Sequence, residues 1–200
     1  MSMNSSISLV KKAVVIFETR YGNTERIAKA LTKGIRKSGM ETTCYNMNDL
    51  QIGTFTECEF IAIGAPTQYR TASEPMKGFL EKVERVDLRG KYGFAFDTRV
   101  DSFWAGSAAE FIEKKLKSVG LQIVRPRSSA IVRHADEEGK ESKEAGSGES
   151  KEERKARRAR EKEERRSKAV LEDGMEELFE NIGEEIGQIL ASKDKMTTIV

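Results

Sequence analysis

The stretch Val14-Val-Ile-Phe-Glu-Thr-Arg-Tyr-Gly-Asn-Thr-Glu-Arg-Ile-Ala28 decides the fold of this 200-residue chain. It overlaps the apolar run Ala13–Phe17, which is typical of a strand buried on both faces of a sheet. A short polar loop follows, and apolar residues then recur at four-residue spacing, which predicts a helix over 24–37. The first N–H groups of a helix have no intrahelical partner and lie at the positive end of its dipole. The loop is therefore a candidate phosphate site.

The composition of this loop narrows the kind of phosphate site. Thr19, Asn23 and Thr24 supply side-chain donors, and Gly22 allows close approach of the backbone. No lysine follows the glycine, so the loop is not that of a nucleoside triphosphatase, and it lacks the GxGxxG pattern of Rossmann dinucleotide sites. An ordinary strand-to-helix turn with a threonine cap is the alternative at this point.

The rest of the chain alternates apolar runs with amphipathic stretches, as parallel α/β proteins do. The expected fold class is α/β, a doubly wound sheet with helices on both faces. We expect further strands at 42–47, 60–64 and 92–96, and a fifth formed by 121–124 and 130–132 around an interruption. Further helices are expected to begin near Pro75, near Ala108 and at Leu171.

One connection is longer than this pattern allows. Residues 134–168, between the fifth strand and the last helix, are rich in charged residues, serine and glycine and cannot form a core of their own. Successive blocks of the chain carry net charges of +7 (1–134), −4 (135–150), +5 (151–168) and −6 (169–200), which gives the total of +2. We expect one domain over 1–200, with a solvated helix within 149–166 or an unstructured linker in the insert.

The phosphate loop, Thr19-Arg-Tyr-Gly-Asn-Thr24, resembles the phosphate-loop signature of the flavodoxin family. The family typically has threonine at the position of Tyr21, so the loop lacks one hydroxyl ligand for the phosphate. The resemblance extends to Gly64-Ala-Pro-Thr-Gln-Tyr69, which follows the third strand, and to Asp97-Thr-Arg99 with Gly106-Ser-Ala-Ala109, which follow the fourth. It covers about residues 12–133 and 168–191.

The resemblance implies a five-stranded parallel sheet of order 2-1-3-4-5 with flavin mononucleotide (FMN) at its carboxyl edge. It implies an electron-transfer protein that shuttles electrons between a reductase and an acceptor, with no catalytic side chain and no metal. Tyr69 and Trp104 are expected to line opposite faces of the flavin ring. The FMN-binding residues that it implies are Thr19, Arg20, Tyr21, Gly22, Asn23, Thr24, Pro66, Thr67, Gln68, Tyr69, Asp97, Thr98, Arg99, Phe103, Trp104 and Gly106.

Two other functions are compatible with the same residues. One is an NAD(P)H-dependent quinone or flavin reductase of the same fold, although the loop after the fourth strand lacks the glycine-rich stretch usual in such enzymes. The other is a non-redox interaction protein that retains the fold and binds through its charged insert. Tyr69 as a solvated loop residue and Trp104 as a packing residue are likewise open alternatives.

Composition limits location and partners. No stretch approaches the roughly 20 apolar residues of a membrane helix, and 1–10 lack the pattern of a signal peptide. Cys44 and Cys58 are the only cysteines, which argues against a disulfide framework, so we expect reduced thiols in the cytoplasm. His134 is the only histidine and has no ligand partners near it in the sequence. The alternating charge blocks argue against a nucleic-acid surface. We expect the insert to lie outside the flavin site and to dock an acidic partner.

Overall fold

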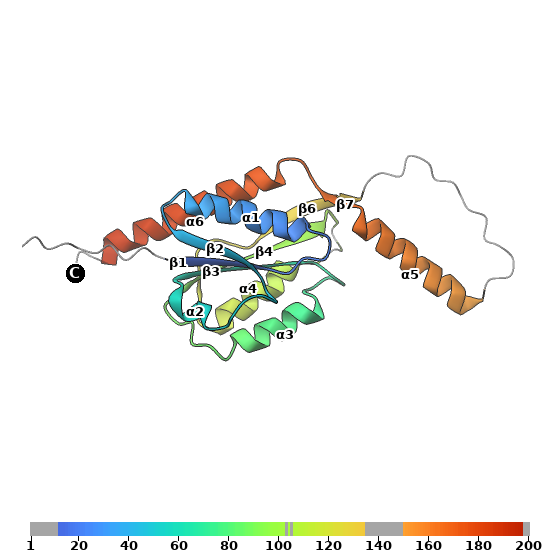
Figure 1. Cartoon of the computed structure of the whole chain (residues 1–200), viewed down its shortest axis with the longest axis horizontal. Helices are drawn as coiled ribbons and strands as arrows, with labels where there is room; N and C mark the ends of the chain where they lie inside the picture. The colour runs from blue at the N-terminus through green and yellow to red at the C-terminus, as the bar shows by residue number, and fades with distance from the viewer. Residues whose placement is uncertain (1–11, 103, 105, 135–149, 198–200) are drawn as a thin grey trace, which may run out of the picture.

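The computed structural model describes residues 12–102, 104, 106–134 and 150–197. A mostly parallel sheet of order β2-β1-β3-β4-β6-β7 forms its centre, and the short strand β5 pairs with β4 beside β6 (Figure 1). The strands are β1 Lys12–Phe17, β2 Glu41–Asn46, β3 Phe60–Pro66, β4 Tyr92–Val100, β5 Gln122–Ile123, β6 Ser128–His134 and β7 Ala169–Leu171. The helices are α1 Asn23–Arg36, α2 Thr54–Glu57, α3 Glu74–Val83, α4 Ala108–Ser118, α5 Lys151–Ser167 and α6 Met175–Thr197.

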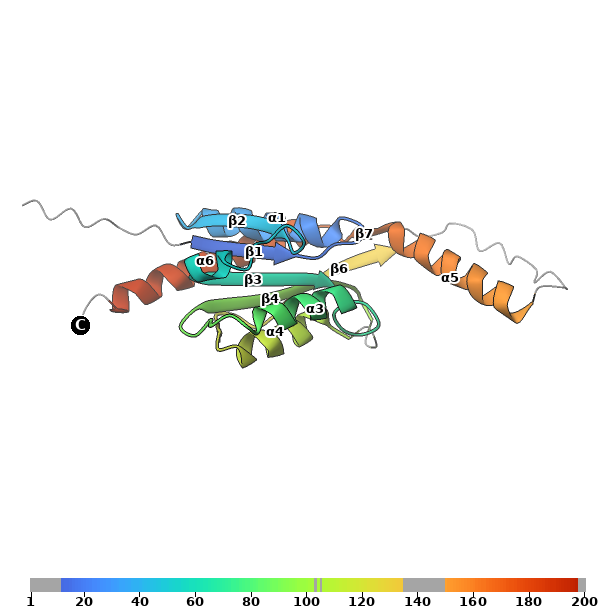
Figure 2. The ribbon, with the colours of Figure 1, turned by 60° about the horizontal axis from the view of Figure 1, so that its bottom comes forward.

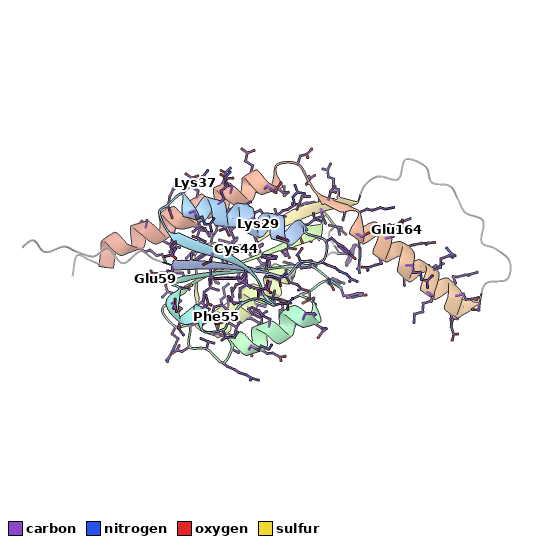
Figure 3. The ribbon with its side chains drawn as sticks, viewed as in Figure 1. Lys29, Lys37, Cys44, Phe55, Glu59 and Glu164 are labelled. Carbon is purple, nitrogen blue, oxygen red and sulfur yellow. The ribbon has the colours of Figure 1, made fainter. Side chains whose placement is uncertain are left out.

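Helices cover both faces of the sheet, with α1 and α6 on one side and α2, α3 and α4 on the other (Figures 1 and 2). Alternate residues of β1 enter the two cores: Val14 packs with α3 and α4, whereas Val15 packs with α1 and α6. Phe55 of α2 is fully buried in the first core, and Figure 3 shows it below the sheet. A strand buried on both faces explains the continuous apolar run in the sequence.

The pair α1 and α6 packs closely because glycines meet at the contact. A side-chain carbon at Gly34 would overlap the carbonyl of Glu180, and one at Gly183 would overlap the carbonyl of Leu31. On the exposed side of this contact, three glutamates of α6 form ion pairs with basic residues in α1 or directly after it: Glu176, Glu180 and Glu184. Glu180 binds Lys33 and Lys37 at 2.7 and 2.8 Å.

The parallel order expected from the resemblance is confirmed, and four details differ from the expected fold. The interrupted fifth strand is two strands that both pair with β4. Strand β7, antiparallel to β6, and the short helix α2 were not anticipated. Leu171 belongs to β7 and not to the last helix. That helix begins at Met175, directly after Gly174, which has a φ of 80°.

Of the two alternatives left open for the insert, a solvated helix or an unstructured linker, the structure has a helix, α5, over Lys151–Ser167. Its first turn is fixed by a capping box: the Glu153 amide donates to the Ser150 hydroxyl at 3.2 Å, and the Ser150 amide donates to the Glu153 carboxylate at 2.9 Å. Both views show α5 projecting from the rest of the fold, beyond β6 and β7 (Figures 1 and 2). Residues 135–149 of the insert lie outside the described residues.

In the part of the chain that the structure describes, no helix is long and apolar enough to span a bilayer.

Candidate functional site

The loops that follow β1, β3 and β4 converge on a cavity of about 450 Å³ at the carboxyl edge of the sheet. This volume lies in the range of small-molecule and cofactor sites. Twelve of the sixteen expected residues line it, together with six others. The lining consists of Thr19, Arg20, Tyr21, Asn23, Thr24, Pro66, Thr67, Gln68, Tyr69, Arg70, Thr98, Arg99, Val100, Trp104, Val132, Arg165, Arg166 and Ala169.

The loop after β1 is shaped by a left-handed glycine. Gly22 has a φ of +85° and no atom lies within 4 Å of where its side-chain carbon would be. Its amide donates to the Thr19 hydroxyl at 2.9 Å, which closes the turn. Gly22, not Thr24, is the residue that precedes α1, and no side chain that the structure describes caps the helix, so the alternative of a threonine-capped turn was wrong. The first amides of α1 follow directly after this open space, and Asn23 and Thr24 line the cavity.

Thr24 contributes in another way, by joining two of the three loops. It is almost fully buried, and its hydroxyl oxygen lies 2.8 Å from that of Thr98, at the end of β4. Both threonines line the cavity. This bond fixes the start of α1 against the neighbouring loop, so the phosphate loop and the loop after β4 form one wall.

The loop after β3 ends in a tight turn that its sequence disfavours. Gln68 and Thr71 exchange two backbone hydrogen bonds of 2.9 and 3.0 Å, and the central residues Tyr69 and Arg70 have φ of 46° and 72°. Such a turn usually carries asparagine and glycine, because residues with a side chain are strained at positive φ. The turn places Tyr69, which is 77% exposed, at the edge of the cavity.

Asp97 organises the loops without lining the cavity. It is fully buried, and its Oδ2 accepts hydrogen bonds from the Thr67 hydroxyl (2.9 Å), the Ser107 hydroxyl (2.7 Å) and the Ala109 amide (3.0 Å). It thereby ties the loop after β3 to the start of α4. The Asp97 Oδ1 atom is buried and has no partner among the described residues.

Gly22 and Gly106 also lie outside the lining, and Phe103 lies outside the described residues. Gly106, at a φ of 68°, packs against the backbone of Arg70 where a side chain would overlap, and its carbonyl accepts a 3.2 Å hydrogen bond from Arg99. Gly106 thereby holds the loop after β3 against the loop after β4. Whether Tyr69 and Trp104 lie on opposite faces of a flavin remains a prediction.

The end of the charged insert belongs to the cavity, so the expectation that the insert lies outside it was wrong. Arg165 and Arg166 of α5 and Ala169 of β7 are among the lining residues. The Asn23 side chain donates to the carbonyl of Ala169 at 2.8 Å, and Glu163 pairs with Arg20 at 2.7 Å. Sequence periodicity gave no sign of these contacts, because they depend on where the chain returns after the insert.

Charge in this cavity has one sign. Among the residues that the structure describes, five arginines and no carboxylate line it: Arg20, Arg70, Arg99, Arg165 and Arg166. Three of them also lie near aromatic rings: Arg20 is 5.6 Å from the Tyr21 ring, Arg70 5.9 Å from the Trp104 ring and Arg166 5.5 Å from the Tyr69 ring. Burial and a hydrogen bond to Glu163 raise the pKa of the Tyr21 hydroxyl, so it remains a neutral donor at neutral pH. The site thus favours an anionic ligand.

Three features of the cavity fit a phosphorylated flavin: its side-chain hydrogen-bond donors, the open space beside Gly22 and the exposed aromatic residues. Threonine, asparagine and arginine side chains lie where a phosphate would meet the start of α1, and Tyr69 and Trp104 offer flat surfaces for a ring. Within the described residues, no group of three or more histidine, cysteine, aspartate or glutamate side chains could hold a metal ion.

Comparison with known proteins assigns the chain to a family. The family model described as flavodoxin matches residues 15–163. The chain is 33% identical over 88 residues to a flavodoxin from Clostridium saccharobutylicum, a match over 44% of this chain and 55% of that one. It is 24% identical over 153 residues to the flavo-diiron protein FprA2 of Clostridium acetobutylicum, over 72% of this chain and 37% of that one. It therefore spans little more than half of one relative and about a third of the other.

A solved structure supports the fold independently. The structure of a flavodoxin from the domain Archaea superposes with a TM-score of 0.63 at 20% identity, over 88% of this chain and 96% of that one. Because the family model covers most of the chain, and because the cavity lies at the edge of the sheet where this fold binds its ligand, the assignment follows: the chain belongs to the flavodoxin family, and its cofactor is FMN.

Proposed function

We propose that the cavity holds FMN with its phosphate on residues 19–24 and its ring between the loops 66–70 and 97–106. The observation that carries this proposal is the convergence of these three loops on one cationic cavity. Thr19, Asn23 and Thr24 would donate to the phosphate together with the first amides of α1, and Arg20 would balance its charge. Tyr69 and Trp104 would stack on the ring and exclude water from it.

The protein then acts as an electron carrier between redox partner proteins. FMN supplies the redox chemistry, while the chain binds, orients and shields it. Tyr69 and Trp104 are 77% and 69% exposed, so the ring edge beside them would be open to a partner. We further propose one FMN-binding domain over residues 1–200 and a cytoplasmic location, which the two free thiols at Cys44 and Cys58 support.

Two assays on the purified chain test this function. Stepwise anaerobic reduction, followed by visible absorption, is expected to show one bound flavin per chain that accepts and returns electrons reversibly. Steady-state oxidation of NADPH or NADH with a quinone acceptor is expected to stay at the rate of free FMN. Turnover well above that rate would contradict the carrier role and support a reductase, and a chain that gains no visible absorption with FMN would contradict both.

A further inference from the structure

The basic residues of α5 gather on one side of the helix. With 3.6 residues per turn, six of the basic residues whose side chains the structure describes fall within an arc of about 120°. We call this arc the basic face; it consists of Lys151, Arg154, Lys155, Arg158, Arg165 and Arg166. The glutamates of the helix lie outside this arc: Glu152, Glu153, Glu161, Glu163 and Glu164.

The basic face is accessible along its length. Lys151, Arg154, Lys155 and Arg158 are exposed, and both ribbon views show α5 standing clear of the sheet and its covering helices. Figure 3 shows side chains leaving α5 into open space, with Glu164 on the part nearest the fold. A helix with this composition cannot be held by a core, so its charged surface is the feature on which a function can depend.

The inner end of α5 is anchored beside the flavin cavity. Glu163 pairs with Arg20 at 2.7 Å, and Asn23 donates to the Ala169 carbonyl at 2.8 Å just after the helix. Arg165 and Arg166 belong both to the basic face and to the cavity lining. The basic face therefore runs about 20 Å from its outer end to the mouth of the cavity.

We propose that the basic face of α5 is the docking surface for a redox partner with an acidic surface, which it brings to the exposed edge of the flavin. The inference rests on the proposed function. Clustered charges of one sign speed encounter with an oppositely charged protein and fix its orientation. The anchored end at Arg20 and Asn23 makes that orientation useful, because it sets the partner against Tyr69 and Trp104.

Two other occupants fit the helix less well. A helix in a nucleic-acid groove has phosphates on both sides, and the five glutamates outside the basic face would meet them. A helix on a membrane surface needs an apolar face, and α5 has only Ala156 and Ala159 as apolar residues. A protein that approaches from one side meets the basic face alone.

The test compares two double variants that remove the same charge from different sides of one helix. Arg154→Gln with Arg158→Gln weakens the basic face, and Arg157→Gln with Arg160→Gln makes the same chemical change outside it. The probe is an oxidised acidic [2Fe–2S] ferredoxin immobilised at low ionic strength, with association of the FMN-loaded chain followed by interferometry. We expect the first variant to lower the association rate constant about tenfold and to flatten its salt dependence, and the second to change it less than twofold.

Equal losses in both variants would overturn the proposal, because they would show an effect of net charge alone. The absence of salt-dependent association in the unaltered chain would overturn it too. So would a first variant that keeps ferredoxin binding but loses binding to a single-stranded RNA oligonucleotide or to phosphatidylserine vesicles. FMN affinity, measured separately by fluorescence quenching, is expected to be the same in all three proteins. If the unaltered chain did not bind FMN, that result would count against the proposed function and not against the docking surface.

Discussion

The Tyr21 hydroxyl donates a hydrogen bond to the carboxylate of Glu163, 142 residues later in the chain. The same carboxylate pairs with Arg20. Two residues of the phosphate loop are thus held by the last turn of a helix that lies within an insert. The contact joins the cofactor site to the charged helix that extends from it.

Glu163→Gln is expected to loosen α5 from the phosphate loop. The variant loses the ion pair with Arg20, whose side chain is about half exposed, so the cost is at most about 1 kcal/mol. Hydrogen exchange of the amides of 160–168 is expected to rise up to about fivefold. The control is Glu164→Gln, which removes a carboxylate that binds Lys168 at 2.8 Å on the same turn. Equal exchange in both variants would show that Glu163 does not anchor the helix.

Gly22→Val is expected to weaken FMN binding more than tenfold. Valine at a φ of +85° is strained, and its side chain would fill the open space through which a phosphate approaches the backbone. Gly39→Val is a matched control, because Gly39 has the same φ and open surroundings but follows the other end of α1, away from the loop 19–24. Isothermal titration with FMN measures the effect, and a similar loss in the two variants would place the phosphate elsewhere.

Tyr69→Ala and Trp104→Ala are expected to weaken FMN binding about 5- to 100-fold, since stacking on an aromatic ring contributes about 1–3 kcal/mol. Affinity for inorganic phosphate is expected to stay within twofold, because neither residue belongs to the loop 19–24. Tyr69→Phe is expected to bind FMN almost normally, because it keeps the ring. If phosphate and FMN affinities fell together, the two aromatic residues would only shape their loops.

Asp97→Ala is expected to lower the free energy of unfolding by about 1–3 kcal/mol, because it leaves the buried Ala109 amide and two partly buried hydroxyls without this acceptor. Asp97→Asn is expected to cost clearly less, since its amide oxygen can take the position of Oδ2. Urea denaturation of the two variants gives the comparison. Equal costs would show that the negative charge, and not the set of hydrogen bonds, stabilises the loops.

The contact between α1 and α6 predicts a pH dependence. Hydrogen bonds from Lys33 and Lys37 hold the pKa of Glu180 below its ordinary value of 4.5. A lowered carboxyl pKa adds stability above the ordinary pKa, and this stability is lost as the pH falls through the folded-state value. The double variant Lys33→Gln with Lys37→Gln is expected to be less stable than the unaltered chain at pH 7, by a margin that shrinks below pH 4.5. A margin that stays constant down to pH 3 would rule this origin out.

The sequence predicted the parts of the fold that depend on local pattern. The apolar run Ala13–Phe17 and the helix after Gly22 follow from burial on two faces and from four-residue periodicity. The three loops could be located because the carboxyl ends of neighbouring parallel strands meet at one edge. Twelve of the sixteen expected residues line the cavity for this reason.

The parts that were missed depend on contacts between distant segments. Strand β7 is three residues long and forms only because the chain returns to β6 after the insert, so no periodicity marks it. Arg165 and Arg166 reach the cavity for the same reason. Asp97 was expected to bind the cofactor, but its partners Thr67, Ser107 and Ala109 became evident only once the loops were placed together.

Parallel titrations of the apo chain with FMN and with riboflavin, followed by quenching of flavin fluorescence, test whether residues 19–24 bind the FMN phosphate. The two flavins differ only in the phosphate that we place on residues 19–24. We expect strong quenching that saturates at one FMN per chain, with riboflavin bound at least about 100-fold more weakly, because charge-assisted bonds to an anion each contribute about 1.5–3 kcal/mol. Equal affinity for the two flavins, or no quenching by FMN at micromolar concentration, would contradict this expectation.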